Sequence, residues 1–116
     1  SPYMNSASDV LRKEIESYDF QNARVPIILN RTAQPETEAS ALKENLIHQV
    51  VSPVKWIQSM TWIANQVDMS VECGYGKVLT GLSKKIMPDH KIYPLSDVSG
   101  YETFMKDVLL KEDTHV

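Results

Sequence analysis

The loop at residues 74–77 is the stretch of this chain whose residue types could best support chemistry. Gly74 and Gly76 permit positive φ angles and a close approach of a bound group to the backbone, and Lys77 adds a positive charge directly after them. Apolar residues recur at helical spacing from residue 78 onward, so the loop would place an anion at the amino end of a helix. The loop lacks the third glycine of a dinucleotide-binding fingerprint and the Gly-Lys-Ser/Thr ending of a phosphate loop. A tight strand-to-helix turn without a ligand is therefore the favoured interpretation.

The other reactive side chains form no catalytic or metal-binding constellation in the sequence. His48, His90 and His115 are far apart, and no serine stands in a Gly-x-Ser-x-Gly elbow. One cysteine and three distant histidines lack the spacing of metal ligands, so no metal site is expected. We interpret His48 as a partly exposed helical histidine and Cys73 as a small core residue at the end of an apolar strand face.

Length and composition indicate one ordinary globular domain, or a fragment of one, over residues 1–116. The hydrophobic content is 42%, the charged content is 23% and the formal net charge is -3. This acidic balance argues against a nucleic-acid partner, and no stretch approaches the 18 or so apolar residues of a membrane span. A lone cysteine fits a reducing, cytoplasmic setting. The local basic excess at Lys77, Lys84 and Lys85 is either a solvated helix face or a contact for an acidic partner.

Hydrophobic periodicity predicts an α/β fold with the element order α-β-α-α-β-α-β-α. Strands separated by helices cannot pair as hairpins, so we expect a small, mainly parallel sheet with helices on both faces. The run at residues 25–30 is expected to be a strand buried on both faces. Ser52 with Pro53, and Ser99 with Glu102, have the residue types that begin helices. The strands are expected at residues 25–30, 67–73 and 91–96, and the helices at about residues 6–18 and 37–51 and after residues 52, 77 and 99.

Four stretches resemble a known enzyme family in order and spacing. Residues 71–82, VECGYGKVLTGL, look like the motif EVGPGKVLTGL of bacterial malonyl-CoA:acyl carrier protein transacylases. Residues 46–56, LIHQVVSPVKW, are similar to the family pattern LxxQLxSPVxW, and residues 26–30, PIILN, to its PVxxN strand. Residues 1–4, SPYM, resemble the residues directly after the histidine of the family's active-site FHS. The resemblance implies the C-terminal part of a larger, α/β-hydrolase-like acyltransferase domain, beginning just after the active-site histidine.

The resemblance also implies where the chemistry of the family would lie. The nucleophilic serine and the basic histidine would both precede this chain, so the 116 residues alone would be inactive. Gln49 stands at the position whose backbone carbonyl orients that histidine, and Asn30 stands near the substrate. Lys77, Lys84 and Lys85 would contact the acidic acyl carrier protein. The departures from the family pattern are Tyr75 for proline, Cys73 for valine and Arg31 for a small apolar residue.

The reaction implied by the resemblance moves malonyl from coenzyme A to acyl carrier protein in fatty acid biosynthesis, through an acyl-serine intermediate. This transferase chemistry of lipid metabolism would need no cofactor, because the partner carries the phosphopantetheine arm. Two alternatives stay open. The enzyme could serve a polyketide pathway, or the chain could be a stand-alone binding or scaffold module. Because part of the domain's apolar surface would be uncovered, we expect the chain by itself to associate with other copies.

Overall fold

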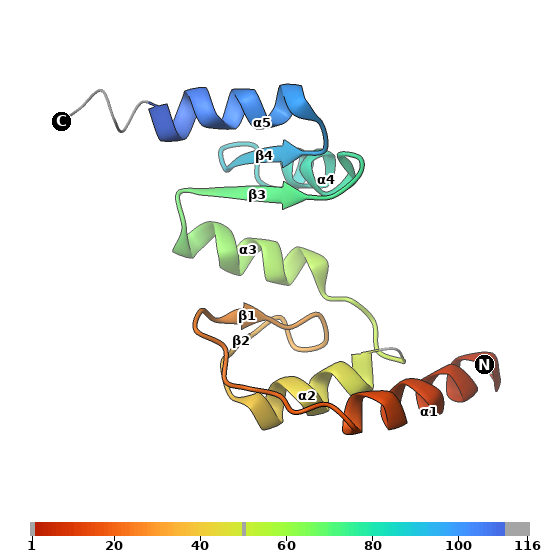
Figure 1. The fold of residues 1–116 in the computed structure, drawn as a ribbon. Coiled ribbons are helices and arrows are strands. Elements are labelled where there is room, and N and C mark those ends of the chain that lie inside the picture. The colour runs from red at the N-terminus through yellow and green to blue at the C-terminus, as the bar shows by residue number, and fades with distance from the viewer. Residues whose placement is uncertain (1, 50, 111–116) are drawn as a thin grey trace. The chain divides into compact units, whose positions relative to one another are not determined.

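The computed structural model describes residues 2–49 and 51–110, so the prediction about His115 lies outside the described residues. The chain divides into two compact units, Ser1–Trp62 and Ile63–Val116, which we call unit 1 and unit 2 and describe separately. The expectation of a single domain therefore stays a prediction. The elements, labelled in Figure 1, are α1 (Pro2–Glu16), β1 (Ile27–Ile28), β2 (Pro35–Glu36), α2 (Ala39–Gln49), α3 (Trp56–Gln66), β3 (Met69–Cys73), α4 (Val78–Ile86), β4 (Lys91–Leu95), α5 (Val98–Phe104) and the π-helical turn η1 (Met105–Leu109).

Unit 1 contains α1, a two-stranded hairpin and α2, followed by most of α3. Lys43 on α2 holds the end of α1, because its Nζ donates to the backbone oxygens of Glu16 at 3.2 Å and Tyr18 at 2.8 Å. The same ammonium group lies 5.6 Å from the centroid of the Phe20 ring, within the range of a cation–π interaction. These contacts attach the segment that leads into the hairpin to α2.

The structure corrects the prediction of a buried strand at residues 25–30. Only β1 is extended there, and it pairs antiparallel with β2, an element that periodicity did not predict. Val25 is 72% exposed and Ile27 is 48% exposed, so this run is not buried on both faces. The hairpin turns through Ala33, which is buried and has a φ of 58°. A left-handed conformation is uncommon for alanine, so the residue type at position 33 gives no signal for this turn.

Unit 2 confirms the predicted strand–helix–strand unit. β3 and β4 are parallel, in a register that runs from Met69 opposite Lys91 to Cys73 opposite Leu95. Side chains alternate along a strand, and Glu72 on β3 reaches the first turn of α4 while Tyr93 on β4 contacts a residue of α5. Because Val71 is the register partner of Tyr93, Glu72 and Tyr93 point to opposite faces of the pair. α4 and α5 therefore contact opposite faces of the β3–β4 pair.

The described residues bury little apolar surface. The buried apolar side chains among the described residues, Ile15, Ala33, Ile47 and Met60, all belong to unit 1, and none of the described apolar side chains of unit 2 is buried to the same degree. The buried side chains described in unit 2 are polar, namely Glu72, Thr80 and Ser83. Large apolar side chains remain exposed on both units, among them Val25 in unit 1 and Val78 in unit 2.

Three local predictions are wrong. Ser52 and Pro53 do not begin a helix, because the Ser52 hydroxyl donates to the backbone oxygen of His48 at 2.8 Å and α3 begins only at Trp56. The N-cap of α5 is Asp97, whose Oδ1 accepts the backbone N–H of Gly100 at 2.7 Å, and not Ser99. Cys73 is exposed rather than buried.

Candidate functional site

The glycine loop of unit 2 has the predicted strand-to-helix geometry, and an internal carboxylate occupies the place of the anion. Gly74 and Gly76 have φ angles of 123° and 81°, which favour glycine. The buried Glu72 carboxylate accepts the backbone N–H groups of Leu79 at 3.1 Å and Thr80 at 2.9 Å. It also accepts a hydrogen bond from the Thr80 hydroxyl, with an oxygen–oxygen distance of 2.6 Å.

These bonds bear on the two interpretations of the loop. Two N–H groups in the first turn of α4, those of Leu79 and Thr80, already donate to Glu72, so a second anion there would meet its negative charge. Burial by itself would raise the pKa of the Glu72 carboxyl, but the hydrogen bonds from Thr80 and Leu79 outweigh it and lower that pKa. The Glu72 carboxylate is therefore ionised at neutral pH, and the turn without a ligand remains the favoured interpretation.

The residues singled out in unit 1 lie around the end of α2. Gln49 is the last residue of α2, and its backbone oxygen accepts the N–H of Ser52 at 3.3 Å. Asn30 follows β1, and its backbone oxygen accepts the N–H of Lys55 at 2.9 Å. Both residues are thus attached through backbone bonds to the segment that connects α2 with α3.

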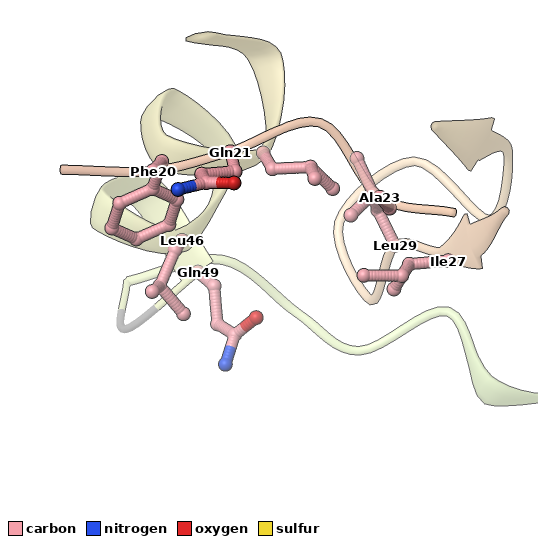
Figure 2. A pocket seen from close by; sticks show the side chains of 8 residues that line it. Phe20, Gln21, Ala23, Ile27, Leu29, Leu46 and Gln49 are labelled. Atoms are coloured by element: carbon pink, nitrogen blue, oxygen red, sulfur yellow. The ribbon is translucent and has the colours of Figure 1, made fainter. Parts of the chain in front are cut away.

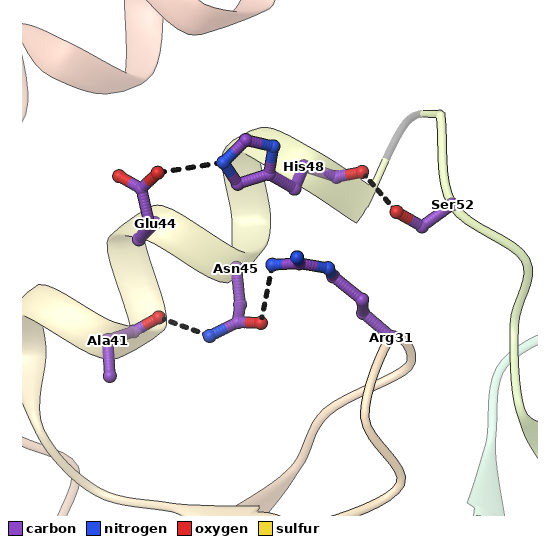
Figure 3. Close-up of polar contacts among 6 residues, drawn as sticks. All are labelled: Arg31, Ala41, Glu44, Asn45, His48 and Ser52. Carbon is purple, nitrogen blue, oxygen red and sulfur yellow. Dashed lines mark hydrogen bonds and ion pairs between the residues drawn. The ribbon is translucent and has the colours of Figure 1, made fainter.

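A side-chain network holds the loop after β1 against α2 (Figure 3). Arg31 Nη1 donates to Asn45 Oδ1 at 3.4 Å, and the Asn45 amide donates in turn to the backbone oxygen of Ala41 at 2.8 Å. One turn further along α2, His48 Nε2 lies 2.7 Å from Glu44 Oε1. His48 is half-buried and paired with a carboxylate on its own helix, which confirms its interpretation as a partly exposed helical histidine. Arg31, which departs from the family pattern, connects the loop after β1 to α2 through its hydrogen bond with Asn45.

An apolar pocket of about 380 Å³ lies beside Gln49 in unit 1 (Figure 2). Its lining has two polar side chains, Gln21 and Gln49, and neither is titratable or nucleophilic. Among the described residues, the pocket therefore has no catalytic side chain of its own. The residues that line it are Phe20, Gln21, Ala23, Ile27, Leu29, Leu42, Leu46 and Gln49.

Sequence reasoning missed one serine–histidine contact. The Ser70 Oγ lies 2.7 Å from the His90 Nε2, so residues twenty positions apart meet where β3 and β4 begin. Open α/β sheets place their ligands at the carboxyl ends of the strands, which is the other end of this pair. The contact therefore joins the starts of the two strands and does not build an active site.

The three lysines lie on α4 or next to it, and all are exposed. Lys77 is the N-cap residue of α4, and Lys84 and Lys85 lie in its last turn. Cations in the last turn of a helix also interact favourably with the helix dipole, which accounts for part of their placement. Within the described ranges, no group of three or more His, Cys, Asp or Glu side chains could hold a metal ion, and no helix is long and apolar enough to cross a membrane.

Comparison with known proteins shows that this α/β chain is similar to part of the malonyl-CoA:acyl carrier protein transacylases. It is 39% identical over 108 residues to the malonyl CoA-acyl carrier protein transacylase of Staphylococcus aureus, a match that covers 86% of this chain and 35% of that protein. The crystal structure of the malonyl-CoA:acyl carrier protein transacylase of Xanthomonas oryzae is 27% identical, with a TM-score of 0.83, over 92% of this chain and 34% of that one. A malonyl-transacylase solved in complex with a type II PKS acyl-carrier protein is 30% identical, with a TM-score of 0.82, over 90% of this chain and 34% of that one.

The chain is therefore homologous to a part of the malonyl CoA-acyl carrier protein transacylases, the family that its motifs predicted. It spans about one third of the length of these relatives. No protein-family model matches the chain.

Proposed function

We propose that this chain is the C-terminal part of a malonyl-CoA:acyl carrier protein transacylase and that it positions the catalytic histidine of the enzyme. The observation that carries the proposal is the 39% identity over 108 residues to a transacylase about three times as long as the matched part. The nucleophilic serine and the histidine would come from the polypeptide that the relatives carry outside the matched third. The whole enzyme would transfer malonyl from coenzyme A to the phosphopantetheine thiol of acyl carrier protein, without a cofactor and in the cytoplasm.

The end of α2 suits the role proposed for Gln49. The last carbonyls of a helix have no partner within the helix, and a carbonyl oxygen has two lone pairs. The Gln49 oxygen can therefore accept a second hydrogen bond beside the one from Ser52. A histidine whose Nδ1–H is bound to this oxygen keeps its Nε2 unprotonated, and Nε2 can then take the proton of the serine hydroxyl.

The charge of the helix end favours the same step. When the histidine accepts the proton from serine it becomes an imidazolium cation, while the serine oxygen attacks the thioester carbonyl and displaces coenzyme A. The carboxyl end of a helix carries a partial negative charge, which stabilises a nearby cation. The carbonyl of Gln49 would therefore fix the tautomer of the histidine and stabilise its protonated form.

We predict that removing the side chain of Gln49 leaves activity nearly unchanged, because the proposal assigns the role to its backbone oxygen. The protein for this test is a chimera in which this chain replaces the matched third of the Staphylococcus aureus relative. Gln49→Ala should change kcat/KM for malonyl transfer by no more than about twofold. Asn30→Ala, which removes a side chain proposed to lie near the substrate, should lower kcat/KM about tenfold. A large loss with Gln49→Ala would show that its side chain, and not its carbonyl, carries the role.

We propose that Lys77, Lys84 and Lys85 contact the acidic carrier. Replacing all three by glutamate in the chimera should raise the KM for the carrier protein about tenfold at low salt. Charges at the edge of an interface mainly change the rate at which the two proteins associate. The rate at which malonyl-CoA acylates the enzyme should not change. The matched control replaces Arg12, Lys13 and Arg24, three exposed basic residues of unit 1, by glutamate and so changes the net charge by the same amount. Equal effects of the control and the triple variant would mean that overall charge, and not this surface, sets the KM.

A carrier from a polyketide pathway is the second candidate partner. It is favoured by the structural neighbour that was solved with a type II PKS acyl-carrier protein, at 30% identity to this chain. Comparing kcat/KM of the chimera for a fatty acid carrier and a polyketide carrier decides between the two.

A further inference from the structure

Tyr75 is the most exposed of the large apolar side chains in the part of the chain that the structure describes, at 103%. It lies in the loop between β3 and α4, and the glycines on either side of it, Gly74 and Gly76, have positive φ angles. Exposed apolar residues that occur singly are normal and need no explanation. Tyr75 differs from them through the charge beside it, because Lys77 follows two residues later and is also exposed.

The exposed side of α4 continues this positive charge. Residues 77, 84 and 85 lie on one side of a helix with 3.6 residues per turn, and the opposite side carries the buried Thr80. Lys77 and Lys84 are separated by about 10 Å along the helix axis, at about 1.5 Å per residue. An interface of standard size covers about 800 Å² on each partner. One partner can therefore contact Tyr75 and all three lysines together, and we call Lys77, Lys84 and Lys85 the basic side of α4.

We propose that Tyr75 anchors the carrier protein beside the basic side of α4, with its ring packed against an apolar patch of that acidic partner. The inference rests on the proposed function and deepens it, because it adds an apolar contact to the proposed charged contacts. Stable interfaces have an apolar centre and a polar rim, and tyrosine is enriched among the residues that contribute most to binding. A tyrosine side chain also loses little conformational freedom on binding, since it has only two χ angles.

Two features favour the carrier protein over coenzyme A as the partner of Tyr75. The N–H groups of Leu79 and Thr80 already donate to the Glu72 carboxylate, so a phosphate group of coenzyme A at the loop would meet a negative charge. The three lysines are also spread along α4, which suits several acidic side chains of a protein better than the phosphates of one small ligand.

The position and residue type of Tyr75 suit a role in the choice of carrier. Tyr75 follows the carboxyl end of β3, which is the end at which open α/β sheets place their sites. The family pattern has proline at this position, so the ring adds contact area that the pattern lacks. A carrier with a matching apolar patch should therefore bind better than a carrier with a charge at that place.

Tyr75→Ser in the chimera tests the inference, with the acyl carrier protein of Staphylococcus aureus as the probe. Removing the ring should raise the KM for the carrier about tenfold and leave the rate at which malonyl-CoA acylates the enzyme unchanged. Tyr75→Phe keeps the ring and should change that KM by no more than about twofold. The matched control is Tyr101→Ser, at a 53% exposed tyrosine on α5, and it should leave the KM unchanged.

Salt distinguishes the apolar contact from the charged contacts. The effect of Tyr75→Ser should persist at about 0.5 M salt, because burial of apolar surface is not screened, whereas the effect of replacing the three lysines should shrink. A second measurement uses the chain of 116 residues itself. Titration with the same carrier should show about tenfold weaker binding for Tyr75→Ser, and the Tm should not change because the side chain is exposed.

An unchanged KM for the carrier with Tyr75→Ser would overturn the inference. Slower acylation by malonyl-CoA would overturn it too, since the ring would then contact coenzyme A. A loss with Tyr75→Phe as large as that with Tyr75→Ser would assign the role to the hydroxyl group and not to the ring. An equal loss with Tyr101→Ser would show that the effect is not specific to this loop, and both of these results also contradict the inference.

Failure of the proposed function looks different. A chimera that transfers no malonyl, together with a chain whose binding to the carrier depends on Tyr75, would leave the anchor intact and overturn the assignment of activity. A chimera that transfers malonyl with the same KM for the carrier with and without the Tyr75 ring would keep the activity and overturn the anchor. Absence of carrier binding to both proteins would overturn both.

Discussion

Replacing Gly100 by alanine should destabilise unit 2, because Gly100 is the glycine of this chain at which an added Cβ would meet a close neighbour. A Cβ at this position would collide with the backbone oxygen of Pro94, and its next neighbour would be Asp97 Oδ1 at 3.3 Å. Pro94 belongs to β4, whose backbone is held by its pairing with β3, so the oxygen cannot move aside without breaking the pair. The added methyl group would therefore move α5 away from β4.

A retreat of α5 would disrupt two contacts that the structure shows. The Gly100 N–H would leave Asp97 Oδ1, and the edge-to-face contact of Phe104 with Tyr93, at 5.6 Å between ring centroids, would open. Overpacking of this kind costs about 3 kcal/mol. Urea unfolding of the isolated chain, followed by circular dichroism, measures this change.

The glycine at position 81 is the matched control for this experiment. Gly81→Ala adds the same methyl group to the same unit at a position with open space, so it should stabilise the isolated chain by about 0.5–1 kcal/mol. A loss below about 0.5 kcal/mol with Gly100→Ala would contradict the close approach of α5 to β4.

Removing the carboxylate of Glu72 is the second change with a large expected effect. Glu72→Ala would leave three buried or half-buried donors without a partner: the N–H groups of Leu79 and Thr80 and the Thr80 hydroxyl. Leaving such donors unsatisfied, together with loss of the charge at the helix N-terminus, should cost about 3 kcal/mol of unfolding free energy. Glu72→Gln keeps the shape but not the charge and should cost roughly half as much.

The pH dependence of stability gives the same residue a second signature. The pKa of Glu72 is lower in the folded chain than its ordinary value of 4.5, so the unfolded chain binds the proton more tightly. The stabilisation is therefore fully present above pH 4.5 and is lost as the pH falls through the lowered pKa. The urea concentration at the midpoint of unfolding should be measured from pH 7 down to pH 3. It should fall less steeply with decreasing pH for Glu72→Gln than for the unmodified chain. Parallel curves would show that Glu72 is not the titrating group.

The sequence predicted the strand–helix–strand unit well because its signals are local. The change from alternation in residues 69–73 to helical spacing after Gly76 marks both elements and the turn between them. The prediction of a buried strand at residues 25–30 was wrong because the signals that decide its structure are not local. A short apolar run with β-branched residues fits a buried strand or an exposed hairpin equally well, and the pairing of β1 with β2 depends on a turn through Ala33.

The role of Glu72 could not be predicted from alternation alone. The alternation of apolar and polar residues over 67–73 puts Glu72 on the polar side of the strand with Asp68 and Ser70, whereas in the structure its carboxylate binds the backbone N–H groups of Leu79 and Thr80 on α4. A glutamate just before a glycine loop that opens a helix is the signal that could have found it. The role of Gln49 was predicted from the family resemblance and not from residue spacing. Every residue type has a backbone carbonyl, so the sequence does not reveal which carbonyl has a role. The start of α5 was ambiguous because Asp97 and Ser99 are both good N-cap residues.

The most direct test of the central claim is the intact mass of two proteins before and after incubation with malonyl-CoA. The isolated chain should gain no mass, and the chimera in which this chain completes the Staphylococcus aureus relative should gain a single malonyl group, which acyl carrier protein then removes. A chimera that folds but gains no mass would contradict the claim that this chain completes a malonyl transferase. Acylation of the isolated chain would contradict the claim that its nucleophile lies elsewhere, and the exposed Cys73 would be the first residue to replace.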